Sequence, residues 1–367
     1  MYARLAKRFG KGGSTVSQYG GCKARIHFPT CKASTEPEPT LPIESNSPDY
    51  PFRSRDAITA ALSFWIYSPD EDLPVPGYTL VRLIRASENS PVQWAIVKSQ
   101  DTMYVVFRGT KLESTLTDVI IDVSALPFAW RYDSDSDISI GVQGGMWTAL
   151  HSQKKATAER IKDELMTEIN ALNSDMKIVL CGHSLGGGYA ILCGLELLHM
   201  GVTIDAIVAH GPPQVIKPDY SMDLWLRLGD ITTVYINGFD IVPRLPSCHE
   251  DWKKAILSLM GPAWTRKNTF GWCTCHSDAI VEDSGIWRTF EQMQDYRHVG
   301  KLMFMTTSAE NGVVCTRVDA NGPKGEDGEG WEKLKSPPPG HYEDLVIEHH
   351  GVREYKNVLE LGLPIPE

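Results

Sequence analysis

The chain has 367 residues, of which 42% are hydrophobic and 22% are charged, with a formal net charge of −10 at pH 7. This length suits one large α/β domain or two small ones, and the composition is that of a soluble globular protein. The negative charge argues against nucleic acid as the main partner. No transmembrane segment is predicted, because the uncharged run 178–195, which approaches the required length, contains five glycines.

The first 35 residues are basic, with seven Lys or Arg and no Asp or Glu. This composition is typical of an organellar transit segment, and a disordered basic tail explains it equally well. Residues 36–52 contain five prolines and are predicted to be a linker, so one folded domain is expected over 53–367. An intracellular location, cytosolic or organellar, is the corresponding expectation.

Apolar periodicity and turn residues predict a series of helices and strands after this linker. In chain order they are helix 56–67, strands 78–84, 93–97 and 102–107, helix 147–172, strand 178–180, helix 189–200, strands 204–209 and 232–236, helix 251–260 and closing helix 352–361. The polar, Gly- and Pro-rich stretch 319–340 reads as a loop. The alternation of strands and helices after Thr102 indicates an α/β fold with a mainly parallel sheet.

A sharp turn is predicted between the apolar strand 178–180 and the helix that follows it. The turn residues Gly182-His-Ser184-Leu-Gly186 fit the G-x-S-x-G pattern of a nucleophile elbow. Such a turn tolerates only very small neighbours, which explains glycine two residues before and two after the serine. It would lift the Ser184 hydroxyl clear of the sheet and point helical N–H groups at any oxygen bound there.

A serine hydroxyl needs a base to take its proton and a carboxylate to orient that base. In this type of site the chain order is Ser, then Asp or Glu, then His. Asp240 lies just past a predicted strand, at the sheet edge where active-site residues of open α/β sheets gather. Asp205, inside a strand, and Asp230, in a predicted turn, are weaker candidates.

The base must be one of the histidines late in the chain, which are His298, His341, His349 and His350. His349 and His350 lie in a predicted loop before the closing helix. In an extended segment their side chains point in opposite directions, so only one can face Ser184. The other would face solvent or pack against the last helix.

An oxyanion formed at Ser184 needs two donors. The backbone N–H of Leu185, the residue after the serine, is one candidate. Thr110 is the other, through its N–H or its hydroxyl, because it follows a predicted strand and Gly109 would allow close backbone approach.

Five of the eight cysteines fall into two groups with different expected roles. Cys181 and Cys193 flank the elbow and are predicted to be buried free thiols. Cys248-His249 and Cys273-x-Cys275-His276 could ligate zinc, but their spacing is shorter than the usual pattern. Metal, a disulfide and ordinary loop thiols stay open for these residues, and the last is favoured.

Four blocks now resemble the class 3 (fungal-lipase-type) triacylglycerol lipases of the α/β-hydrolase superfamily. They are VVFRGT at 105–110, GHSLGG at 182–187, NGFDIVPRLP at 237–246, and His350 followed five residues later by Tyr355. The segment YRHVG at 296–300 is also similar, and the likeness extends over about 56–361. The elbow with the Asp-Ile-Val-Pro block is the most specific part, and the histidine block is the loosest.

The resemblance implies an α/β-hydrolase fold and a carboxylic ester hydrolase of triacylglycerol or diacylglycerol lipase type. Ser184 would be the nucleophile, Asp240 the orienting acid and His350 the base, with Thr110 and Leu185 forming the oxyanion hole. No cofactor or metal is implied. The substrate would be a lipid ester, an acylglycerol or polar glycerolipid, met by transient contact with a lipid surface.

In this family a lid follows the oxyanion strand, and the matching stretch here is 111–139. It contains the apolar cluster 126–130 beside several aspartates, which as a lid could cover the acyl groove and turn outward on lipid. An ordinary buried loop is the alternative. The chain departs from the family at 142–146, which lacks the usual histidine and Gly-Phe pair, and in its longer 248–315 stretch.

Two other functions remain open from the sequence. One is an esterase for small or feruloyl-type esters with the same triad. The other is a non-catalytic, lipase-like signalling module, against which the complete set of Ser, Asp, His and Thr argues.

Overall fold

The computed structural model describes residues 55–87, 91–110, 127–131, 139–152, 156–172, 176–217, 222–245, 296–308, 312–319, 349–351, 354–356 and 359. All of them belong to one unit of the chain, Pro48–Glu367. The predictions for residues 1–52, for helix 251–260 and for loop 320–340 lie outside the described residues. None of the described helices is long and apolar enough to cross a membrane.

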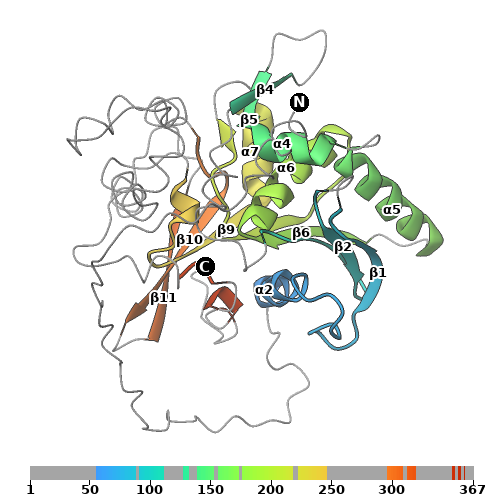
Figure 1. Ribbon diagram of the computed structural model, residues 1–367, viewed down its shortest axis with the longest axis horizontal. Helices are drawn as coiled ribbons and strands as arrows, with labels where there is room; N and C mark the ends of the chain where they lie inside the picture. The colour runs from blue at the N-terminus through green and yellow to red at the C-terminus, as the bar shows by residue number, and fades with distance from the viewer. Residues whose placement is uncertain are drawn as a thin grey trace, which may run out of the picture. The chain divides into compact units, whose positions relative to one another are not determined.

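The described part of the chain contains an eight-stranded sheet with the order β1-β2-β3-β6-β7-β9-β10-β11. Its strands are β1 (Thr79–Ile84), β2 (Trp94–Lys98), β3 (Thr102–Phe107), β6 (Lys177–His183), β7 (Ala206–His210), β9 (Thr232–Asn237), β10 (Lys301–Ser308) and β11 (Gly312–Asp319). The central strands from β3 to β10 pair in parallel, and the strands at both edges pair antiparallel. The predicted mainly parallel sheet is therefore confirmed (Figure 1).

The central strands are apolar on both sides because helices cover both faces of the sheet. Along β6, Ile178 and Leu180 belong to one hydrophobic cluster, whereas Val179 and Cys181 belong to a second. Successive side chains of a strand point to opposite faces, so these two clusters lie on opposite faces of the sheet. Buried parallel strands read as continuous apolar runs for this reason.

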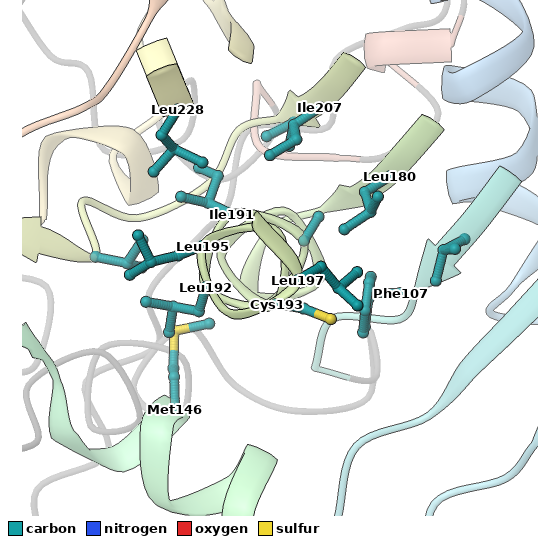
Figure 2. Close-up of a cluster of buried hydrophobic side chains, with 14 of the residues drawn as sticks. Phe107, Met146, Leu180, Ile191, Leu192, Cys193, Leu195, Leu197, Ile207 and Leu228 are labelled. Atoms are coloured by element: carbon teal, nitrogen blue, oxygen red, sulfur yellow. The ribbon is translucent and has the colours of Figure 1, made fainter. Parts of the chain in front are cut away.

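One face of the sheet is packed against α6 (Leu185–His199), the helix that follows the elbow. Side chains from all around α6 are buried, and they meet residues of the sheet, of α4 (Gly144–His151) and of α7 (Met222–Ile231). Figure 2 shows this cluster with Leu180 and Ile207 of the sheet, Met146 of α4 and Leu228 of α7 around the helix. The elbow is thus anchored by a helix that is buried on nearly every side.

The opposite face is packed against α2 (Arg55–Trp65). Leu62 and Trp65 of this helix join Val179 and Cys181 of β6 in one cluster. Cys181 and Cys193 are buried free thiols, as expected. Burial raises the pKa of the Cys181 thiol to about 12, so it remains protonated and unreactive.

The prediction of one continuous helix over 147–172 is wrong. The structure has two helices instead, α4 and α5 (Thr157–Leu172), separated by a break after Ser152. Apolar residues recur at helical spacing in both helices, so the sequence pattern alone predicts one helix. The strands β10 and β11 and the helix α7 were not predicted.

A second sheet contains three short strands in the order β4-β5-β8, namely β4 (Pro127–Arg131), β5 (Ser139–Gln143) and β8 (Ile216–Lys217). Most of the predicted cluster 126–130 is therefore a strand, β4, which pairs antiparallel with β5. The rest of the predicted lid, 111–126 and 132–138, lies outside the described residues. The lid stays a prediction, and its apolar cluster is held by strand pairing.

Candidate active site

Ser184 lies at the turn between β6 and α6 with φ 57° and ψ −132°. Among the described residues it is the only one other than glycine with a positive φ. A side chain at Gly182 would overlap the backbone of Gly186, and one at Gly186 would overlap Phe107 of β3. The two glycines are therefore required by the closeness of strand, turn and helix, and Ser184 itself is buried on this strained turn.

The turn is also held by backbone hydrogen bonds. The N–H of Ser184 donates to the carbonyl oxygen of His210 on β7 at 2.9 Å. The carbonyl oxygen of Ser184 accepts the N–H groups of Gly187 and Gly188 at 2.9 and 3.3 Å. These contacts leave the first N–H of α6, that of Leu185, at the unpaired end of the helix.

The structure brings Ser184, His350 and Asp240 together, as the sequence predicts. His350 Nε2 lies 2.9 Å from Ser184 Oγ, and His350 Nδ1 lies 2.9 and 3.0 Å from the two carboxylate oxygens of Asp240. The Asp240 side chain is fully buried, whereas that of His350 is 14% exposed. A base within hydrogen-bond reach of the hydroxyl, itself oriented by a carboxylate, is the arrangement that activates a serine.

Asp240 follows β9 and precedes the 3₁₀ helix η1 (Val242–Arg244). Its Oδ1 accepts the N–H of Val242 at 2.9 Å, and its Oδ2 accepts the hydroxyl of Tyr355 at 2.5 Å. Burial, together with the nearby Asp240 charge, raises the pKa of Tyr355 well above its ordinary value. The tyrosine therefore stays protonated as a donor to the carboxylate.

A buried arginine secures the turn that carries this acid. The guanidinium of Arg244 donates to the carbonyl oxygens of Asp240 and Gly238, the second at 2.7 Å. Burial lowers the pKa of Arg244 to about 10, which leaves it charged at neutral pH. A charged donor on two carbonyls of one turn holds that turn more rigidly than neutral donors would.

His183, the residue before the serine, forms a hydrogen bond to the backbone of His350. His183 Nε2 donates to the carbonyl oxygen of His350 at 2.8 Å, and its Nδ1 lies 3.1 Å from the hydroxyl of Tyr67. Burial is the largest cause that lowers the pKa of His183 well below its usual value. The ring is therefore neutral, with its proton on Nε2, and Tyr67 donates to Nδ1.

The end of β3 lies against the elbow, where the sequence places the second oxyanion donor. A Cβ on Gly109 would lie 3.1 Å from Ser184 Cβ and 2.6 Å from the hydroxyl oxygen of Tyr67. Thr110 follows this contact directly and is half-buried, and Leu185 is buried at the start of α6. Both predicted donors thus belong to chain segments that meet at Ser184.

Of the other candidate acids and bases, Asp205 and His298 form hydrogen bonds elsewhere. Asp205 accepts the N–H of Ile178 at 2.8 Å, and Asp230 lies exposed in α7. His298 donates to the carbonyl oxygen of Pro243 at 2.6 Å, and burial lowers its pKa to about 4. His341 lies outside the described residues.

The expectation that His349 faces solvent or the last helix is wrong. Its Nδ1 accepts the N–H of Phe239 at 2.9 Å, and its ring stacks on that of Phe239. Residues 349 and 350 form a turn and not an extended segment, so both side chains contact the turn after β9. The sequence offered no signal for this pairing, nor for the contacts of Tyr67 and Arg244.

No group of three or more His, Cys, Asp or Glu that could hold a metal ion occurs within the described ranges. The possible ligands Cys248, His249, Cys273, Cys275 and His276 lie outside those ranges. The choice among metal, disulfide and loop thiols for them therefore stays open.

Parts of this chain are similar in sequence to known proteins. A lipase of Caenorhabditis elegans is 26% identical over 265 residues, which are 71% of this chain and 62% of the relative. The lipase of Rhizomucor miehei is 25% identical over 40% of the chain and 38% of its own length. Diacylglycerol lipase-beta of Mus musculus is 26% identical over 44% of the chain and 23% of its own length. The chain thus spans less than two thirds of each relative.

Solved structures include the native Rhizomucor miehei lipase propeptide complex, with a TM-score of 0.48 and 17% identity over 71% of each chain. The family model "Lipase (class 3)" matches residues 104–250, which contain β3, the elbow and Asp240. Over this segment the chain is similar to the class 3 lipases, and the relatives that it matches are also named as lipases.

Proposed function

We propose that the protein is a serine hydrolase that cleaves carboxylic esters of acylglycerols or polar glycerolipids through an acyl-enzyme. The observation that carries this proposal is the position of His350, whose ring bridges Ser184 Oγ at 2.9 Å and the Asp240 carboxylate at 2.9 Å. A buried polar cluster without catalytic purpose would have no reason to place its serine on a strained turn.

The geometry supports the following reaction. Ser184 Oγ attacks the ester carbonyl carbon while His350 Nε2 takes the hydroxyl proton, and Asp240 stabilises the imidazolium that forms. The tetrahedral intermediate collapses, the C–O bond to the alcohol breaks, and His350 gives its proton to the leaving alkoxide. Water then attacks the acyl-enzyme with His350 as base again, which releases the carboxylic acid and restores Ser184.

Charge that develops on the carbonyl oxygen needs donors in place before the reaction. The N–H of Leu185 at the start of α6 and the N–H or hydroxyl of Thr110 supply them in this proposal. The contact of Gly109 with the elbow supports the second donor, because it brings the end of β3 beside Ser184. No metal or cofactor takes part in these steps.

The lipid substrate rests on the class 3 lipase segment and on the relatives, which are named as lipases and, in one case, as a diacylglycerol lipase. Transient contact with a lipid surface belongs to the same proposal, and the segment 111–139 would serve as the lid. Replacing Phe128 and Trp130 by Ser should then reduce hydrolysis of emulsions more than that of dissolved short esters. Equal losses on both would contradict a lid at this position.

Labelling with a fluorophosphonate tests the hydrolase directly. The parent should be labelled at Ser184, and the Ser184→Ala variant should fold, escape labelling and lose about 10⁶ in kcat. Ser184→Ala activity within tenfold of the parent would contradict the assignment. A parent that is not labelled would indicate a non-catalytic, lipase-like module.

A series of nitrophenyl esters of increasing acyl length tests the substrate class. Sustained or rising turnover beyond short chains supports an acylglycerol or glycerolipid hydrolase. Activity that fades beyond short chains would favour a small-ester or feruloyl-type esterase with the same triad.

We further propose an intracellular location, cytosolic or organellar, with residues 1–35 as the segment that decides between the two. The support is its basic composition without acidic residues. Residues 1–35 fused to a fluorescent protein should reach an organelle if the segment is a transit peptide. Diffuse cytosolic fluorescence would favour a disordered tail.

A further inference from the structure

Two consecutive histidines contact the turn that carries Asp240. His350 Nδ1 lies within 3.0 Å of both carboxylate oxygens of Asp240, and His349 Nδ1 accepts the backbone N–H of Phe239 at 2.9 Å. The side-chain amide of Asn237 also donates to the carbonyl oxygen of His349 at 3.1 Å. The loop bearing the base and the turn bearing the acid are therefore joined at three neighbouring points.

The position of the His349 ring is closely determined. Its centroid lies 5.4 Å from that of the Phe239 ring, with an interplanar angle of 7°. A Cβ on Gly238, which has φ 41°, would overlap the His349 ring, so this residue must be glycine for the ring to approach. The turn after β9 is thus shaped to receive His349 as well as His350.

The two hydrogen bonds require opposite tautomers of the neighbouring rings. The backbone N–H of Phe239 can only donate, so Nδ1 of neutral His349 must carry the lone pair and its proton must be on Nε2. The carboxylate of Asp240 accepts, so Nδ1 of His350 carries a proton and its Nε2 is free to accept from Ser184 Oγ. Each ring therefore has a distinct role at one turn.

We propose that His349 is a positioning residue that latches the base-bearing loop to the acid-bearing turn and so sets the distance between His350 and Asp240. This proposal rests on the hydrolase function proposed above. The latch acts through His350 and does not touch the substrate. Its loss should therefore lower kcat and leave KM unchanged, because small displacements of a catalytic group reduce rate strongly.

Three substitutions of His349 distinguish the effect of its hydrogen-bond acceptor from the effect of its aromatic ring. His349→Ala removes both, His349→Phe keeps a ring for stacking but lacks the acceptor, and His349→Asn keeps an acceptor, since its Oδ1 occupies the place of Nδ1. For each variant, kcat and KM on dissolved nitrophenyl butyrate, the rate of fluorophosphonate labelling and the melting temperature are measured. Alanine and phenylalanine should lower kcat and the labelling rate about three- to tenfold with KM within about twofold. Asparagine should restore most of the loss.

A rescue by phenylalanine and not by asparagine would overturn the latch in favour of ring packing alone. Parental rates in all three variants, or a change confined to KM, would also overturn it. If the parent itself is not labelled at Ser184, the hydrolase proposal fails together with the positioning role. A labelled parent with unaffected variants removes the positioning role alone.

A measurement on the parent tests the latch without any substitution or hydrolysis. Long-range proton–nitrogen spectra of protein with isotope-labelled histidine report which ring nitrogen carries the proton. At neutral pH His349 should be the Nε2–H tautomer and His350 the Nδ1–H tautomer. A proton on Nδ1 of His349 would overturn the latch, because that nitrogen could not then accept the Phe239 N–H.

Discussion

The hydroxyl oxygen of Tyr355 lies 2.5 Å from Oδ2 of Asp240, inside the protein and 115 positions further along the chain. The same hydroxyl accepts the backbone N–H of Asn237 at 3.0 Å. Asp240 also accepts the N–H of Val242 and faces Nδ1 of His350. A fully buried carboxylate is tolerable only when its oxygens are paired in this way, so the tyrosine supplies one of the hydrogen-bond donors that Asp240 requires.

Replacing Tyr355 by Phe should therefore weaken both stability and turnover. The change leaves the buried Asp240 oxygen short of one donor and the Asn237 N–H without its acceptor. We expect a loss of about 1–3 kcal/mol in the free energy of unfolding, measured in urea. The rate of fluorophosphonate labelling should also fall, because the carboxylate is less well held. A variant as stable and as reactive as the parent would contradict this role.

His350→Ala should abolish activity about as fully as Ser184→Ala, and the double variant should be no worse than either. Groups that act as one unit give such non-additive losses. His341→Ala should retain more than about a tenth of turnover and serves as the control histidine. Loss of all activity in His341→Ala, with activity retained in His350→Ala, would leave the serine nucleophile in place and reassign the base.

Thr110→Val keeps the size and branching of the side chain while it removes the hydroxyl. If that hydroxyl is an oxyanion donor, kcat should fall by about 10²–10³ with little change in KM, because the donor acts on the transition state. Steady-state kinetics on dissolved short esters measure both constants. A loss confined to KM would place Thr110 outside the oxyanion hole, and an unchanged kcat would leave the backbone N–H as the donor.

Stability should fall as the pH is lowered from about 6.5 to about 4. Burial lowers the pKa of His210 and of His298 to about 4 in the folded protein, from 6.5 for the free side chain. Above pH 6.5 neither state carries protons on these rings, so the full stability is present. Between the two values only the unfolded chain is protonated, so each histidine should cost about 1.4 kcal/mol per pH unit.

Urea unfolding at several pH values between 4.5 and 7 measures this slope. His298→Gln provides the control, since its amide can still donate to the carbonyl oxygen of Pro243 while it does not titrate. The slope should decrease in this variant. An unchanged slope would show that His298 does not contribute to the pH dependence.

Local chain chemistry was sufficient for the elbow and for the strands beside it. Strand β3 ends where its apolar run ends, at Phe107, and Ser184 follows from glycines at fixed offsets in a turn that admits no larger residue. Asp240 could be predicted because it comes after Ser184 in the chain and directly follows a predicted strand, which places it at the same edge of the sheet. These features depend on neighbouring residues, which a single sequence displays directly.

Other features depend on partners far away in the chain. Apolar residues have helical spacing in both α4 and α5, so the side-chain pattern alone does not reveal the break between them. Strand β10 is specified by pairing in parallel with β9, from which it is separated by more than 60 residues. Sequence patterns report burial, whereas pairing partners are chosen by the packing of the whole sheet.

The sequence by itself determined the turn that carries Ser184, because steric crowding within a few residues leaves one place for a serine between two glycines. Only the tertiary structure decided which partners the histidines at 349 and 350 contact. Their loop folds back onto the turn after β9, and the turn conformation at 349–350 directs both rings to that turn. Tyr67 and Arg244 likewise reach the site from separate elements, and contacts of that kind exist only once the chain has packed.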